Sequence, residues 1–112
     1  MIYVPIVLFS FSALLGFVLL SYVLRGKFTP KAFTILHGSL AVLGLVSLIA
    51  LALYSPYKLW LSVILFVLAA IGGFYLLFKD ITDKVPKSVA MIHGLVAVTG
   101  LVVLIFSVLQ LI

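Results

Sequence analysis

The sequence contains no cysteine and no glutamate, and its only carboxylate side chains are Asp80 and Asp83. Without cysteine, disulfides, thiolate metal ligands, iron–sulfur clusters and thiol chemistry are excluded. Charged residues are scarce as well: they make up 8% of the 112 residues, whereas a soluble globular domain has roughly 25%. Hydrophobic residues make up 67%, and the mean hydropathy is +1.54. This composition excludes a soluble globular domain and predicts an integral membrane protein.

The few charges are unevenly distributed along the chain. The net charge is +5, and six of the seven cations lie in two short segments, Arg25–Lys31 and Lys79–Lys87. We interpret this clustering as a topology signal, so no nucleic-acid partner is expected. Cytoplasmic loops of membrane proteins carry an excess of lysine and arginine. The protein is therefore expected to be a multi-pass protein of a bacterial inner membrane, with both basic segments in the cytoplasm and both termini on the outer side.

Four apolar runs are long enough to cross a bilayer, which requires about 20 residues each. Short connections join them, so neighbouring helices must be antiparallel. The sequence therefore predicts an all-α fold, a four-transmembrane-helix up-down-up-down bundle that forms a single integral membrane domain over residues 1–112. The predicted spans are Tyr3–Leu24, Lys31–Tyr54, Leu59–Phe78 and Ser88–Leu111.

The second and fourth spans repeat the same local sequence at a spacing of 56 residues. Residues 30–49 and 86–105 match at eleven of twenty positions without a gap. We therefore interpret the chain as two tandem helical hairpins, repeat 1 over residues 1–56 and repeat 2 over residues 57–112. Since each repeat holds two spans, both repeats insert in the same orientation, and their relating axis runs along the membrane normal.

His37 and His93 are matched by this repeat, and they are the only ionisable side chains well inside a predicted span. Such a residue is a functional-site hypothesis, because hydrocarbon penalises polar groups that lack a partner. Each histidine lies seven residues past a proline, or about 10 Å into its helix at 1.5 Å per residue. Both are therefore at the same depth on diagonal helices, and their imidazoles should face one another across the bundle.

Small residues surround both histidines in the sequence. Each histidine is followed by a glycine, and the residues four and seven positions later, on the same helical face, are alanine and glycine. The first and third spans keep Ala13/Ala69, Gly16/Gly72 and Leu20/Leu76 at matching positions. These patterns predict space for a flat ligand beside the imidazoles. The residues predicted to line it are Gly16, Gly38, Ala41, Gly44, Gly72, Gly94, Ala97 and Gly100.

This arrangement resembles the b-type transmembrane cytochromes, in which histidines on facing helices ligate haem and glycines flank the ring. The resemblance rests on residues 37–44 and 93–100. It implies one haem b, with His37 and His93 as the iron ligands, and electron transfer or redox exchange with a small acceptor such as quinone, oxygen or superoxide. Two-haem cytochromes have two histidines on each ligating helix, whereas this chain has one, so a chain is expected to bind a single haem.

Other interpretations of the histidine pair remain open at this point. The alternative is a non-redox transporter or structural subunit, in which the pair packs helices or relays protons. Small multidrug transporters have a similar size but depend on an intramembrane glutamate, which this chain lacks. A non-haem metal would find an incomplete ligand shell in two imidazoles. Exposed glycine-rich faces also suit a homodimer, in which the ligand pair could be completed across the interface.

The first testable prediction concerns orientation. A reporter that is active only in the cytoplasm should be inactive when fused after residue 112 and active when inserted between Lys79 and Lys87, because the cation-rich segments stay inside. Reporter activity in cells measures both fusions side by side. The opposite pattern would contradict the predicted orientation.

Overall fold

The computed structural model describes residues 1–112 and contains four α-helices and no strand. Each helix is long and apolar enough to cross a membrane. The all-α prediction is therefore confirmed, and the chain is an integral membrane protein. The third helix continues four residues beyond the predicted run. The helices are α1 (Val4–Leu24), α2 (Lys31–Tyr54), α3 (Trp60–Thr82) and α4 (Lys87–Val108).

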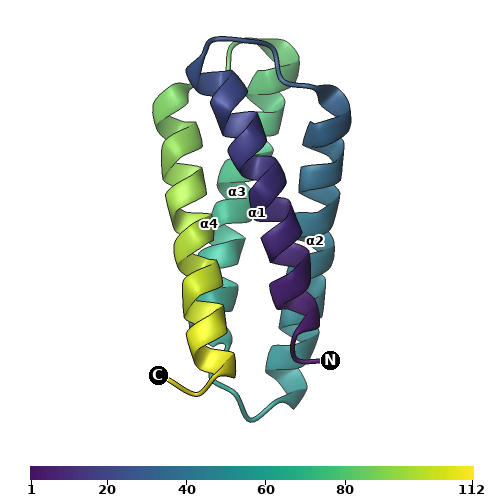
Figure 1. Cartoon of the computed structure of the whole chain (residues 1–112), viewed down its shortest axis with the longest axis vertical. Helices are drawn as coiled ribbons and strands as arrows, with labels where there is room; N and C mark the ends of the chain where they lie inside the picture. The colour runs from purple at the N-terminus through teal and green to yellow at the C-terminus, as the bar shows by residue number, and fades with distance from the viewer.

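The four helices form an up-down-up-down bundle with α1 opposite α3 and α2 opposite α4 (Figure 1). Each helix packs against its two neighbours around the ring, and neither diagonal pair is in backbone contact. The bundle measures 43 × 22 × 19 Å. Both termini and the α2–α3 connection lie at one end, whereas the α1–α2 and α3–α4 connections lie at the other. Six of the seven cations therefore lie at one end of the bundle, as the sequence predicted.

The interior is small, and most of the large apolar side chains point outward. Only 18 of the 112 residues are buried, and the largest fully buried side chains include Leu48, Leu59 and Leu104. Leu48 and Leu104 are 56 residues apart and belong to the same core cluster. A bilayer offers hydrocarbon contacts to the outward side chains, so a membrane bundle does not need a large interior. A functional site inside the bundle is therefore formed by few side chains.

Glycine and proline mark the helix ends at the cation-rich end. Gly26 has φ +67°, a left-handed conformation that glycine adopts without a Cβ penalty. Its N–H donates to the Val23 carbonyl at 3.0 Å, and the Lys27 N–H donates to the Tyr22 carbonyl at 2.9 Å. These two bonds close the last turn of α1. In both hairpins the next helix then begins directly after a proline in extended conformation.

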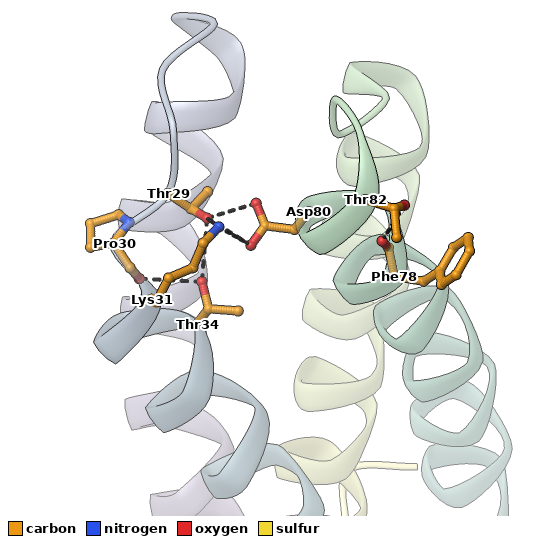
Figure 2. Close-up of polar contacts among 7 residues, drawn as sticks. All are labelled: Thr29, Pro30, Lys31, Thr34, Phe78, Asp80 and Thr82. Carbon is orange, nitrogen blue, oxygen red and sulfur yellow. Dashed lines mark hydrogen bonds and ion pairs between the residues drawn. The ribbon is translucent and has the colours of Figure 1, made fainter.

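A polar cluster joins the C-terminal end of α3 to the start of α2 (Figure 2). The Thr29 hydroxyl lies 2.8 and 2.9 Å from the two carboxylate oxygens of Asp80, and the Lys31 ammonium donates to the same carboxylate at 2.7 Å. The Asp80 side chain is 10% exposed. A carboxylate near a helix N-terminus is also favoured by the helix dipole. This cluster therefore links repeat 1 to repeat 2.

Replacing Asp80 should destabilise the bundle. Asp80→Asn removes the ionic bond to Lys31 and weakens the bond from Thr29, and we expect the free energy of unfolding to fall by about 1–2 kcal/mol. We expect a small loss of stability because the Lys31 side chain is 55% exposed, and solvent weakens such an ion pair. Asp83→Asn is the matched control, since Asp83 is exposed and its side chain has no ionic partner. Thermal unfolding in detergent, followed by circular dichroism, measures both; equal stabilities would contradict the prediction.

Candidate functional site: the histidine pair

His37 on α2 and His93 on α4 meet in the centre of the bundle. Their ring centroids are 6.3 Å apart, and the ring planes are inclined by 82°. Because α2 and α4 are diagonal and make no backbone contact, the two rings alone bridge this diagonal at their level. The predicted juxtaposition of the two imidazoles is therefore confirmed.

Each imidazole is held by a backbone carbonyl of the preceding helix. His37 Nδ1 lies 2.7 Å from the Ser12 carbonyl oxygen of α1, and His93 Nδ1 lies 2.8 Å from the Ala69 carbonyl oxygen of α3. Since a carbonyl oxygen can only accept, each Nδ1 carries the donated proton, and in the neutral imidazole each Nε2 then has a lone pair. Neither Nε2 makes a hydrogen bond within the protein. The site therefore contains two oriented imidazoles whose Nε2 atoms are available to bind a metal ion.

Glycines allow this close approach of helix and ring. A Cβ added at Gly16 would lie 3.0 Å from His37 Cε1, and one added at Gly73 would lie 3.2 Å from His93 Cε1. Gly16 lies one helical turn beyond Ser12, and Gly73 lies one turn beyond Ala69. In each repeat, the same helical face thus supplies both the carbonyl acceptor and the glycine against which the ring packs.

The structural counterpart of Gly16 is Gly73, one residue later than the pairing with Gly72 that a fixed spacing of 56 gives. Gly72 also lies beside His93, with its added Cβ 3.7 Å from Nδ1, but Gly73 is closer. A spacing of 57 for the first and third helices yields seven identities over residues 8–20, whereas a spacing of 56 yields three. The seven pairs are Leu8/Leu65, Phe9/Phe66, Ala13/Ala70, Gly16/Gly73, Phe17/Phe74, Leu19/Leu76 and Leu20/Leu77.

A one-residue difference between the two repeats explains this shift. Nine residues separate Leu20 from Pro30, whereas eight separate their counterparts Leu77 and Pro86, so α2 and α4 keep the spacing of 56 while α1 and α3 adopt 57. Sequence reasoning therefore missed Gly73 and the two carbonyl-bearing residues, Ser12 and Ala69. An alignment of the two repeats that allowed a gap would have found the correct pairs.

Gly44 and Gly100 contact phenylalanine rings. A Cβ at Gly44 would lie 3.0 Å from the Phe9 ring, and one at Gly100 would lie 3.3 Å from the Phe66 ring. These two rings stack across the α1–α3 diagonal, with centroids 3.7 Å apart and an interplanar angle of 1°. The space that the sequence left open beside the two glycines is therefore filled by an aromatic layer next to the histidines.

The remaining predicted residues lie further from the rings. Ala41 and Ala97 are half-buried between the histidine and phenylalanine layers. A Cβ added at Gly38 or Gly94 would have no neighbour within 4 Å, so these two glycines lie against open space. The structure thus places Gly16, Gly72 and Gly73 around the histidines, and the other small residues beside or beyond them.

The donor set at the centre consists of two imidazoles and nothing else of comparable chemistry. No group of three or more histidine, cysteine, aspartate or glutamate side chains is present anywhere in the chain. Both carboxylates belong to the cation-rich end of the bundle. A bare metal ion at the histidine pair would thus lack most of its usual protein ligands.

Comparison with known proteins adds nothing to this geometry, since no family model, curated protein or solved structure matches the chain. The chemistry of the site therefore has to be inferred from its own residues.

The glycine contacts generate a second prediction about stability. Gly16→Ala or Gly73→Ala should force the adjacent imidazole away from its carbonyl and lower the free energy of unfolding by about 1–3 kcal/mol, as overpacking does. Gly38→Ala is the control: its Cβ meets nothing, and alanine favours a helix over glycine by up to about 1 kcal/mol. Unfolding in detergent measures all three variants. A Gly16→Ala variant as stable as Gly38→Ala would show that the ring does not pack on this glycine.

Proposed function

We propose that the protein is a membrane b-type cytochrome that binds one haem b between His37 and His93 and transfers electrons. One observation supports this most directly: two imidazoles on diagonal helices have their Nδ1 atoms bound to carbonyls and their Nε2 atoms free, at a centroid distance of 6.3 Å. Two imidazoles bound to one metal ion through bonds of about 2 Å would have ring centroids roughly 6 Å apart. The observed spacing of His37 and His93 would therefore allow both to hold one iron.

The composition of the site favours haem over a bare metal ion. Two neutral nitrogen donors leave most coordination positions of an ion unfilled, whereas a porphyrin brings four nitrogens of its own and needs only two axial ligands. The chain has no cysteine for a thiolate ligand and no carboxylate near the pair. Haem is therefore the cofactor whose needs match what these residues provide.

The positions of the glycines also support this proposal. A haem held by His37 and His93 would need small residues on α1 and α3. At the level of the histidines these helices have Gly16 and Gly73, on which the imidazoles pack, so neither position projects a side chain towards the rings. On the side away from the cation-rich end, the stacked Phe9 and Phe66 rings provide an apolar surface. The chain thus combines two nitrogen donors with small residues on the flanking helices.

Cations at one end of the bundle suit the haem propionates. His37 and His93 are each the seventh residue of a helix that begins at the cation-rich end, so both lie in the half of the bundle nearer to that end. Lys31 is already paired with Asp80, so we assign charge neutralisation to Arg25, Lys27 and Lys87. By the positive-inside rule this end faces the cytoplasm of a bacterial inner membrane, and both termini face outward.

The reaction that haem would supply here is one-electron transfer. If His37 and His93 both held the iron, they would leave it no position for a substrate. A small acceptor such as quinone, oxygen or superoxide would exchange electrons with the edge of the haem. The protein's own residues would bind and orient the cofactor, and none of them is assigned a catalytic proton transfer. A homodimer through the exposed faces of Gly38 and Gly94 would bring two such sites together.

A second candidate function rests on the inclination of the two rings. A centroid distance of 6.3 Å with an 82° angle also suits a direct edge-to-face aromatic pair, and each imidazole bonds the helix before it. In that case the histidines set the helix register of a non-redox membrane protein, a small transporter or structural subunit. Haem content distinguishes this candidate from the first.

Absorption spectra of oxidised and dithionite-reduced protein, purified after expression with haem, test the proposal. The wild type should hold one six-coordinate, low-spin haem per chain, and His37→Ala or His93→Ala should each abolish this spectrum, because one ligand is lost. Ser39→Ala, at an exposed position two residues from His37, should leave the spectrum unchanged. Folded wild type without haem would favour the second candidate. Wild-type spectra in both single variants would show that other residues ligate the iron.

A further inference from the structure

The two histidines of the pair are not equivalent, because only His37 has a hydroxyl beside it. Ser12 Oγ lies 3.1 Å from His37 Nδ1 and 3.0 Å from the His37 carbonyl oxygen. The structural counterpart of Ser12 on α3 is Ala69, which offers His93 only its backbone carbonyl. The repeat thus supplies two matched rings, and one serine makes their surroundings different.

The protons of this arrangement can be assigned from the acceptors. The His37 backbone carbonyl has no proton to give, so the Ser12 hydroxyl donates to it. The Ser12 oxygen is then left with a lone pair towards His37 Nδ1. The Nδ1–H of His37 therefore has two acceptors on one residue, the Ser12 carbonyl at 2.7 Å and the Ser12 hydroxyl at 3.1 Å. The Nδ1–H of His93 has one.

Ser12 lies in the interior, and all its polar atoms near the site are used. The residue is 4% exposed, and its hydroxyl both donates to and accepts from the His37 residue. A buried hydroxyl with no partner would cost free energy, so this one is held in place by the same bonds that hold the ring. His37 Nδ1 thus has two contacts with Ser12, whereas His93 Nδ1 has one, with Ala69.

We infer that Ser12 is a positioning residue that makes His37 the more firmly oriented and more electron-rich of the two nitrogen donors. Acceptors on the Nδ1–H of a ligating histidine fix its tautomer and ring orientation and raise the electron density at Nε2. The orientation holds for the protein without cofactor. The electronic effect rests on the proposed function: if His37 held a haem iron, a more electron-rich His37 would stabilise ferric iron and lower the reduction potential.

The reciprocal variants Ser12→Ala and Ala69→Ser test the orientation without haem. In cofactor-free protein labelled with ¹⁵N-histidine, nuclear magnetic resonance reports the tautomer and the water exchange of each Nδ1–H. Ser12→Ala should speed exchange at His37 by about fivefold and leave His93 unchanged, since one acceptor is lost. Ala69→Ser should slow exchange at His93 alone. Ser12→Thr keeps the hydroxyl and should behave as wild type.

Several results would overturn the inference. Unchanged exchange at His37 in Ser12→Ala, or equal changes at both histidines, would show that the hydroxyl only packs α1 against α2. If Ser12→Ala does not fold, Ala69→Ser still decides, because it adds the acceptor on the other side. Unchanged exchange at His93 in that variant would contradict the role assigned to the hydroxyl.

Haem-loaded protein tests the electronic part separately. Redox titration should show a positive shift of the reduction potential in Ser12→Ala, a negative shift in Ala69→Ser, and the wild-type value in Ser12→Thr. Potentials that do not move while proton exchange does would overturn the electronic effect. If no variant and no wild type binds haem, the proposed function fails, whereas the exchange data still support or overturn the role of Ser12 in orienting His37.

Discussion

In hydrocarbon, a side-chain N–H without an acceptor is costly, and the imidazole N–H groups of this bundle find theirs in the helix backbone. A helix carbonyl is within reach of a ring on the next helix only where the two approach closely. Gly16 and Gly73 permit that approach, since a Cβ on either would lie within 3.2 Å of the adjacent imidazole. The bonds of His37 and His93 to these carbonyls therefore set the position of each helix within its hairpin. The central layers of the bundle follow from this.

The interior alternates between its two diagonals. At one level the rings come from α2 and α4 and the glycines from α1 and α3; at the next level the rings come from α1 and α3, and the glycines are Gly44 and Gly100. Each pair of rings meets at the centre because the flanking helices have no side chain there. The histidine layer and the phenylalanine layer are thus built alike, except that the helices that supply rings in one layer supply glycines in the other. Only the histidine layer has side-chain nitrogens, so the single cofactor that we propose belongs to that layer.

The sequence predicted the spans, the bundle and the facing histidines, because hydropathy and a gapless repeat in the second and fourth helices determine them. It did not predict which glycine contacts His93, because the choice of Gly73 depends on one residue that the second repeat lacks between its two helices. The stacking of Phe9 on Phe66 was missed for a different reason. Periodicity assigns residues to a face, but it does not say which ring occupies the space beside a glycine. The pairing of Asp80 with Lys31 likewise depends on contacts between helices.

The two repeats differ at several equivalent positions, where one repeat has a polar residue and the other an apolar one. Asp80 corresponds to Val23 and Thr29 to Val85, so the α2–α3 interface has an ionic cluster where the α1–α4 interface has valines. Ser12 and Ala69 differ in the same sense. The Ser12 hydroxyl contacts His37 alone, so the two imidazoles have different surroundings. Twofold repetition thus provides the matched imidazoles, and single polar residues make the two positions chemically different.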